Sequence, residues 1–129
     1  MRIGKGAIMR MKTSELSGKA LDWAVAKCEG KDGDCEIFKT NIWYGRVTSG
    51  FIRYHPSTNR DQGYEIVERE GIHLLCDDDL TEWTASAPRK NLVGWRLLSW
   101  GPTPLIAAMR CYVASKLGEY VDVHDEMKS

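Results

Sequence analysis

One short polar stretch contains several kinds of side chain that could bind a ligand. Residues 55–63 read HPSTNRDQG and are flanked by Tyr54 and Tyr64. Imidazole, hydroxyl, amide and guanidinium groups bind the oxygens of small polar or phosphorylated ligands, and tyrosine rings offer a flat face to a base. We expect a ligand-binding loop here; the alternative is an ordinary turn whose side chains satisfy their own backbone. The binding residues expected in the loop are Tyr54, His55, Ser57, Thr58, Asn59 and Arg60.

Aromatic and basic residues elsewhere are further candidates. Trp23, Trp83 and Arg110 are expected to contribute to ligand binding, because indoles stack on bases and guanidinium groups pair with phosphates. Trp43 belongs to the same group. The alternative for each of them is a place in the core or at an interface.

The sequence contains no recognised catalytic or metal-binding motif. The three histidines, His55, His73 and His124, stand outside known catalytic patterns. The acidic run Asp77 to Asp79 lacks the alternating spacing of a calcium loop and is typical of a solvated turn. We therefore expect no catalytic residue, no metal and no cofactor.

The clearest structural element is the segment Gly101 to Gly118. Thr103 suits a helix N-cap, Pro104 the first helical position and Gly118 the end of the helix. Bulky side chains occupy one face of this helix and small ones the opposite face. The small face allows close approach of a second backbone, from this chain or from another copy, so we expect a homo-oligomer. The small face comprises Ala107, Ala108, Cys111, Ala114 and Ser115.

The remaining pattern predicts a second helix and several short strands. Helical spacing covers residues 17–30, and strands are expected within 36–48, 51–54 and 92–100, with a last extended piece at Val121 and Val123. Residues 64–70 and 72–76 are expected to form a hairpin that turns at Gly71. This order predicts an α+β fold, a small mostly antiparallel sheet with two main helices packed on it.

Length and composition restrict the possibilities further. The 129 residues fit one domain, expected over residues 13–123 between a variable N-terminal extension (1–12) and a polar tail (124–129). The formal net charge of zero makes nucleic acid an unlikely partner. No apolar run is long enough to span a membrane, and the four cysteines show no paired motif. We expect a soluble protein with reduced thiols in a cytoplasm.

Four motifs in order resemble a known family. They are ALDWAVAKCEG (20–30), YHPSTNRDQGYEIVEREGI (54–72), WTA (83–85) and GPTPLIAAMRCYVASKLG (101–118). Together they resemble the NinX-like proteins encoded by lambdoid phages and prophages, over residues 13–123. The chain departs from the family pattern at Asn59 and Arg60, where a tryptophan is expected, and at Tyr64, where a glycine is usual. The family is a domain of unknown function, so the resemblance implies no catalytic residues.

The resemblance and the polar loop lead to one main functional hypothesis. We expect a non-catalytic phage protein that binds and sequesters a small nucleotide-derived immune signal and so counters host defence. The alternative is an adaptor that binds a host or phage protein in recombination, replication or gene control, with exposed tryptophans as anchors.

Overall fold

The structure is a computed structural model that describes residues 8–31, 35–38, 41–46, 50–88 and 96–124. Its α-helices are α1 (Gly18–Cys28), α2 (Arg60–Glu70) and α3 (Pro104–Leu117), and η2 (Thr13–Glu15) is a short 3₁₀ turn. The strands are β1 (Ile8–Lys12), β2 (Cys35–Phe38), β3 (Asn41–Arg46), β4 (Gly50–Arg53), β5 (His73–Cys76), β6 (Trp83–Pro88), β7 (Arg96–Gly101) and β8 (Tyr120–His124). The predicted α+β class is confirmed.

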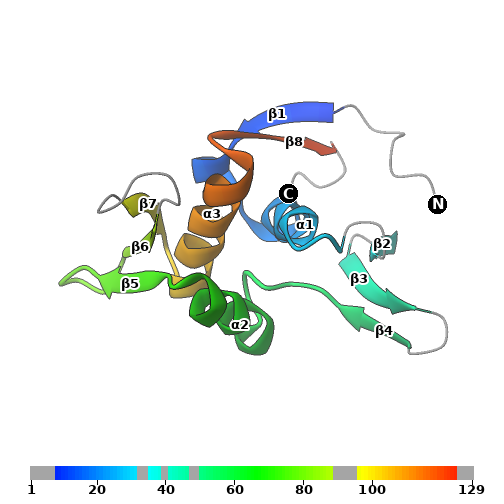
Figure 1. Ribbon diagram of the computed structural model, residues 1–129, viewed down its shortest axis with the longest axis horizontal. Helices are drawn as coiled ribbons and strands as arrows, with labels where there is room; N and C mark the ends of the chain where they lie inside the picture. Colours follow the sequence, from blue (N-terminus) through cyan, green and yellow to red (C-terminus); the bar gives the residue numbers. More distant parts are fainter. Residues whose placement is uncertain (1–7, 32–34, 39–40, 47–49, 89–95, 125–129) are drawn as a thin grey trace.

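The strands form three small antiparallel sheets instead of one. Their orders are β1-β8, β2-β3-β4 and β5-β6-β7. Figure 1 shows the β2–β4 sheet and the β5–β7 sheet on opposite sides of the helices, with the β1–β8 ribbon at one end. The predicted strands in 36–48, 51–54 and 120–124 are confirmed; of the strand predicted over 92–100, residues 92–95 lie outside the described residues.

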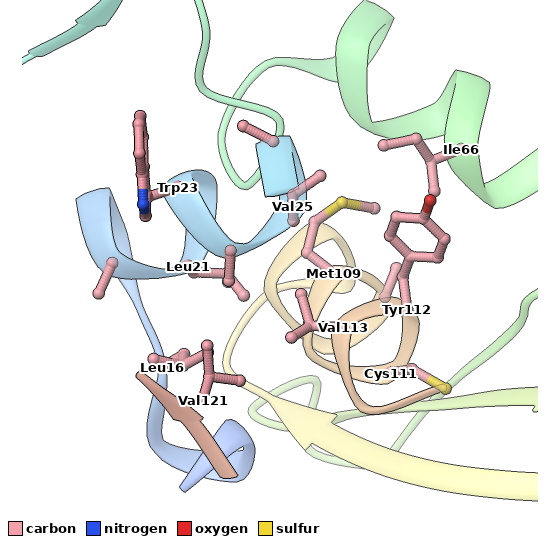
Figure 2. Packing of buried hydrophobic residues seen from close by; sticks show 14 of the residues in the cluster. Leu16, Leu21, Trp23, Val25, Ile66, Met109, Cys111, Tyr112, Val113 and Val121 are labelled. Carbon is pink, nitrogen blue, oxygen red and sulfur yellow. The ribbon is translucent and has the colours of Figure 1, made fainter. Parts of the chain in front are cut away.

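The helix α3 forms the centre of the molecule. Its predicted caps are confirmed, because the Thr103 side chain accepts a hydrogen bond from the Ile106 N–H and Gly118 is the C-cap. Figure 2 shows Met109 and Val113 beside residues of α1, and Tyr112 beside Ile66 of α2. On the opposite face, Cys111 donates a hydrogen bond to the Leu97 carbonyl of β7. Both faces of α3 are therefore used within one chain.

The small face of α3 packs on the chain's own sheet. Ala107, Ala108 and Cys111 are fully buried, and the contacts of α3 are most extensive with β7 and β6. Gly101 shows how close the approach is, because a Cβ atom there would lie 2.7 Å from the Ala107 nitrogen. We expected an oligomer because a second copy could contact this face. In the structure, the β5–β7 sheet of the same chain covers it.

The hairpin predicted for residues 64–76 is wrong in its first arm, because residues 60–70 form α2, a third helix; the strand predicted over 72–76 is confirmed as β5. Asn59 is its N-cap and accepts from the Gln62 N–H, and Gly71 ends it in the left-handed conformation (φ 66°). The helix buries a narrow stripe around Gly63 and Ile66. That stripe has helical spacing, but the polar residues around it resemble a loop. The predicted polar loop consequently ends at Asn59.

The N-terminal strand ties the ends of the chain together. Residues 8–12, expected to belong to a variable extension, form β1 and pair with β8 from Ile8↔His124 to Lys12↔Tyr120. Thr13 donates hydrogen bonds from its nitrogen to the Glu119 carbonyl (2.8 Å) and from its hydroxyl to the Gly118 carbonyl (2.6 Å). The C-terminal end of α3 is thereby fixed to η2. None of the helices in the described part of the chain is both long and apolar enough to cross a membrane.

Candidate functional site

The polar loop between β4 and α2 uses most of its side chains internally. The His55 ring nitrogen Nδ1 lies 2.9 Å from the Thr58 hydroxyl, and the His55 N–H donates to the Gln62 side chain at 2.8 Å. Gln62 in turn donates to the Arg53 carbonyl, and Asn59 caps α2. These contacts are those of the turn alternative, in which the side chains stabilise the local backbone.

A buried aspartate of α1 forms a hydrogen bond with the backbone of this loop. Asp22 is 5% exposed, and its carboxylate accepts a hydrogen bond from the Ser57 N–H at 2.8 Å. Burial raises the Asp22 pKa to about 6. Ser57 is also buried, and its hydroxyl has no hydrogen-bond partner among the described residues. Asp22 was not predicted, since an acidic residue within an otherwise apolar helix gives no sign of the loop it anchors.

The expected loop residues differ in their exposure. Tyr54 is buried in the core (7% exposed), whereas Arg60 is exposed at the start of α2. His55 is half-buried, and its pKa is lowered by burial and by the nearby Arg53 charge. The internal hydrogen bonds of the loop fit the turn alternative, and its role in ligand binding stays a prediction.

The candidate tryptophans belong to the elements α1, β3 and β6 and not to the loop itself. Trp23 is buried in α1 (5% exposed) and belongs to the core, as Figure 2 shows. Trp43 in β3 and Trp83 in β6 are half-buried, and Trp83 packs against the core cluster. Trp23 thus takes the core place that was its alternative.

Arg110, one of the predicted ligand-binding residues, lines a pocket. This pocket, hereafter the Arg110 pocket, has a volume of about 350 Å³. It lies where η2, the β5–β6 turn, the end of β7 and the helix α3 meet. Its lining residues are Ser14, Thr81, Glu82, Trp100, Gly101, Pro102 and Arg110.

The Arg110 guanidinium is fixed in position by two backbone carbonyls. Nε donates to the Leu16 carbonyl at 2.7 Å, and Nη1 donates to the Trp100 carbonyl at 2.8 Å. An arginine has five N–H donors, so three remain beyond these two bonds. Burial lowers the Arg110 pKa, and none of the salt bridges among the described residues includes Arg110. The pocket thus holds a positioned cation that forms no salt bridge with a carboxylate of the described residues.

Asp77 positions two of the residues that line the Arg110 pocket, Thr81 and Glu82. Its carboxylate accepts hydrogen bonds from the Thr81 N–H (2.8 Å), the Thr81 hydroxyl (2.9 Å) and the Glu82 N–H (3.1 Å). Hydrogen bonding from Glu82 and Thr81 lowers the Asp77 pKa. The exposed acidic run 77–79 therefore forms a turn, as its sequence indicates, and this turn sets Thr81 and Glu82 at the pocket.

Trp100 and the other lining residues were missed as site residues. Trp100 is 48% exposed, and its sequence pattern indicates only a position in a strand. Ser14, Thr81 and Glu82 come from two segments far apart in the sequence, and only the tertiary fold brings them to Arg110. The described residues contain no cluster of three or more side chains suited to holding a metal ion.

A second arginine, Arg69, joins the three helices in an ion-pair cluster. Arg69 binds both oxygens of Glu29 (2.5 and 3.0 Å) and also Glu70 (2.9 Å). Tyr112 of α3 donates a short hydrogen bond to Glu29, and Lys116 lies 3.6 Å from Glu70. We call Glu29, Arg69, Glu70, Tyr112 and Lys116 the helix-end cluster. Its charges balance within the chain, as is typical of a structural ion pair.

Comparison with known proteins adds a family but no activity. A search of curated proteins finds no match. The family model described as "Bacteriophage P22, NinX" matches residues 12–116, which include α1, α2, the β5–β7 sheet and all but the last residue of α3. This match confirms the resemblance seen in the four sequence motifs, and the chain belongs to the NinX family of phage proteins.

Proposed function

We propose that this chain is a non-catalytic binding protein that captures a small nucleotide-derived molecule in the Arg110 pocket. In a phage protein, such capture would remove a host immune signal from the host cytoplasm and so counter host defence. The proposal moves the expected site from the 54–60 loop to the pocket. The observation that carries it is Arg110, a partly buried cation whose hydrogen-bond partners among the described residues are neutral carbonyls.

The residues around Arg110 fit a ligand that combines an anionic group with polar groups. A phosphate can accept the remaining guanidinium donors. Ser14 and Thr81 offer hydroxyls, and Glu82 offers an acceptor for a sugar hydroxyl or a base amine. Trp100 contributes its backbone carbonyl, which holds the Arg110 guanidinium at the pocket.

The size of the pocket restricts the ligand class. A volume of about 350 Å³ lies near the lower end of the range for small-molecule sites. With a single arginine among its lining residues, the pocket suits one phosphate group. We therefore expect a mononucleotide-type ligand in preference to a dinucleotide.

Calorimetric titration with defined probes tests this proposal. The probes are nucleoside 5′-monophosphates, 3′,5′-cyclic mononucleotides, unphosphorylated nucleosides and inorganic phosphate. Nucleotides should bind at least about tenfold more tightly than the matching nucleosides, because one charged hydrogen-bonded contact is worth about 1.5 to 3 kcal/mol. Equal affinities for nucleosides and nucleotides would contradict the role of Arg110.

A matched pair of variants locates the site. Arg110→Gln removes the charge but keeps donors for the two carbonyls, and it should weaken nucleotide binding at least about tenfold. Arg60→Gln makes the same change in the exposed loop residue and should leave binding unchanged. Loss of binding in Arg60→Gln alone would return the site to the loop. Mass spectrometry of molecules released by heat, from protein isolated from defence-activated cells, then identifies the natural ligand.

A further inference from the structure

The β5–β7 sheet has an apolar outer face that points away from α3. Strand register places Leu75, Thr84 and Trp100 in one row across the sheet, and His73, Ser86 and Leu98 in the next. The alternate positions, including Leu74 and Ala85, pack toward the core. Leu75 is 72% exposed, Leu98 50% and Trp100 48%. Clustered apolar exposure of this kind on a small protein is characteristic of an interaction surface.

The two ends of this outer face carry opposite charges. The β5–β6 turn at one end holds Asp78, Asp79 and Glu82, all of which are exposed. Arg96, exposed at the start of β7, lies at the other end and pairs with Pro88. Among the described residues, the Arg96 guanidinium donates to neutral acceptors, the Ser86 hydroxyl and the Ser86 and Gly71 carbonyls. Neither end is therefore neutralised by the other.

We propose that a second copy of this chain docks on this face. In this dimer the outer faces of the two sheets stack on each other, and the two-fold axis runs between them, perpendicular to the strands. This arrangement brings the leucines of both copies together. The same axis places Arg96 of each copy over the acidic turn of the other. A surface with an apolar centre, one acidic end and one basic end is complementary to itself in this antiparallel arrangement. A partner of uniform charge would be attracted to one end and repelled by the other.

The size of the face predicts a weak, reversible dimer. A strand of six residues is about 20 Å long, and three strands span about 10 to 15 Å. Such a face buries less than the roughly 800 Å² per partner of a standard interface. This surface is separate from the small face of α3. The proposed dimer therefore forms through different residues from those on which the expected oligomer depended.

Sedimentation velocity over a wide concentration range tests the dimer. The wild-type mass should rise reversibly from the 14.6 kDa of one copy toward twice that value. Leu75→Ser combined with Leu98→Ser should weaken association at least about tenfold while the circular dichroism spectrum is unchanged. Ile52→Ser changes an equally exposed residue (62%) on β4, outside the face, and should leave association unchanged.

Charge exchange tests the antiparallel orientation. Asp78→Lys with Asp79→Lys should weaken the dimer, and addition of Arg96→Glu should restore it, because the two ends then exchange their signs. A wild-type mass of one copy at every concentration would overturn the proposal and leave the face to a different protein. Unchanged association in the double leucine variant would also overturn it. No ligand is added, so these results are independent of the Arg110 pocket.

Discussion

Arg69 and Arg110 both join distant segments of this protein, yet their surroundings differ. Arg69 binds Glu29 through two nitrogens and Glu70 through a third, so its charge is balanced by carboxylates. Among the described residues, Arg110 binds the carbonyls of Leu16 and Trp100, and it lines a pocket. The difference separates a structural arginine from one that is available to an anion. The number of polar residues in a segment does not make this distinction, because the 54–60 loop is rich in them and satisfies several of them internally.

The largest effect on stability is expected from the helix-end cluster. Arg69→Ala leaves the Glu29 carboxylate, whose side chain is only 9% exposed, without its bidentate partner. We expect a loss of about 3 kcal/mol in the free energy of unfolding, because the mostly buried Glu29 carboxylate loses two charged hydrogen bonds, although the Arg69 side chain itself is 43% exposed. Urea unfolding measures it, with Arg60→Ala as the exposed control. Nucleotide affinity should not change; a loss of binding without a loss of stability would reverse the roles of the two arginines.

A somewhat smaller effect should come from Asp22, and it depends on pH. The Asp22 pKa is about 6 in the folded protein, above the ordinary aspartate value of 3.8, so the folded state binds the proton more tightly than the unfolded chain. This contribution to stability is fully present below pH 3.8, and it is lost as the pH rises through 6. Asp22→Asn should remove roughly 2 to 3 kcal/mol of pH dependence between these values and keep an acceptor for the Ser57 N–H.

Urea unfolding of both proteins at several pH values isolates this contribution, because other groups cancel in the difference. Glu29 behaves in the opposite way: burial alone raises its pKa, but hydrogen bonds from Arg69 and Tyr112 hold it below the usual value. The wild-type protein should therefore gain stability relative to Asp22→Asn as the pH falls. A difference that is independent of pH would show that the Asp22 carboxylate is not desolvated.

The smallest effect is expected at the rim of the pocket. Ser14→Ala should weaken nucleotide binding by about 1 kcal/mol, close to fivefold, because one neutral hydrogen bond to the ligand is lost. The free energy of unfolding should change little, since Ser14 is exposed. Calorimetry at a concentration well below that of self-association measures this effect. Unchanged affinity would place the ligand out of reach of the Ser14 hydroxyl.

The sequence predicts the parts of the fold whose signals are local. The caps at Thr103 and Gly118 and the two-faced pattern of α3 identify that helix, and alternating apolar residues identify most strands. Helix α2 was missed because its N-cap Asn59 lies in a polar run and its buried stripe is narrow. The α+β class follows from local patterns, whereas the division into three sheets depends on long-range pairing such as β1 with β8.

The site is less predictable than the fold for a related reason. Arg110 stands out in the sequence as one of two charges on an apolar helix. Its partners in the pocket come from η2, the β5–β6 turn and the end of β7, and no local pattern links these segments. The sequence favours the 54–60 loop because the polar residues of that loop are adjacent. Whether polar groups are already satisfied is a property of three-dimensional contacts.

The most direct test of the central claim is to map a bound anion by NMR. Titration of isotope-labelled protein with adenosine monophosphate should shift the amide signals of Ser14, Thr81, Glu82 and Gly101, together with the Arg110 guanidinium signal. Signals of residues 54–60 and of the helix-end cluster should stay in place. Shifts centred on His55 to Arg60, or no shift at the pocket at saturating nucleotide, would contradict the account.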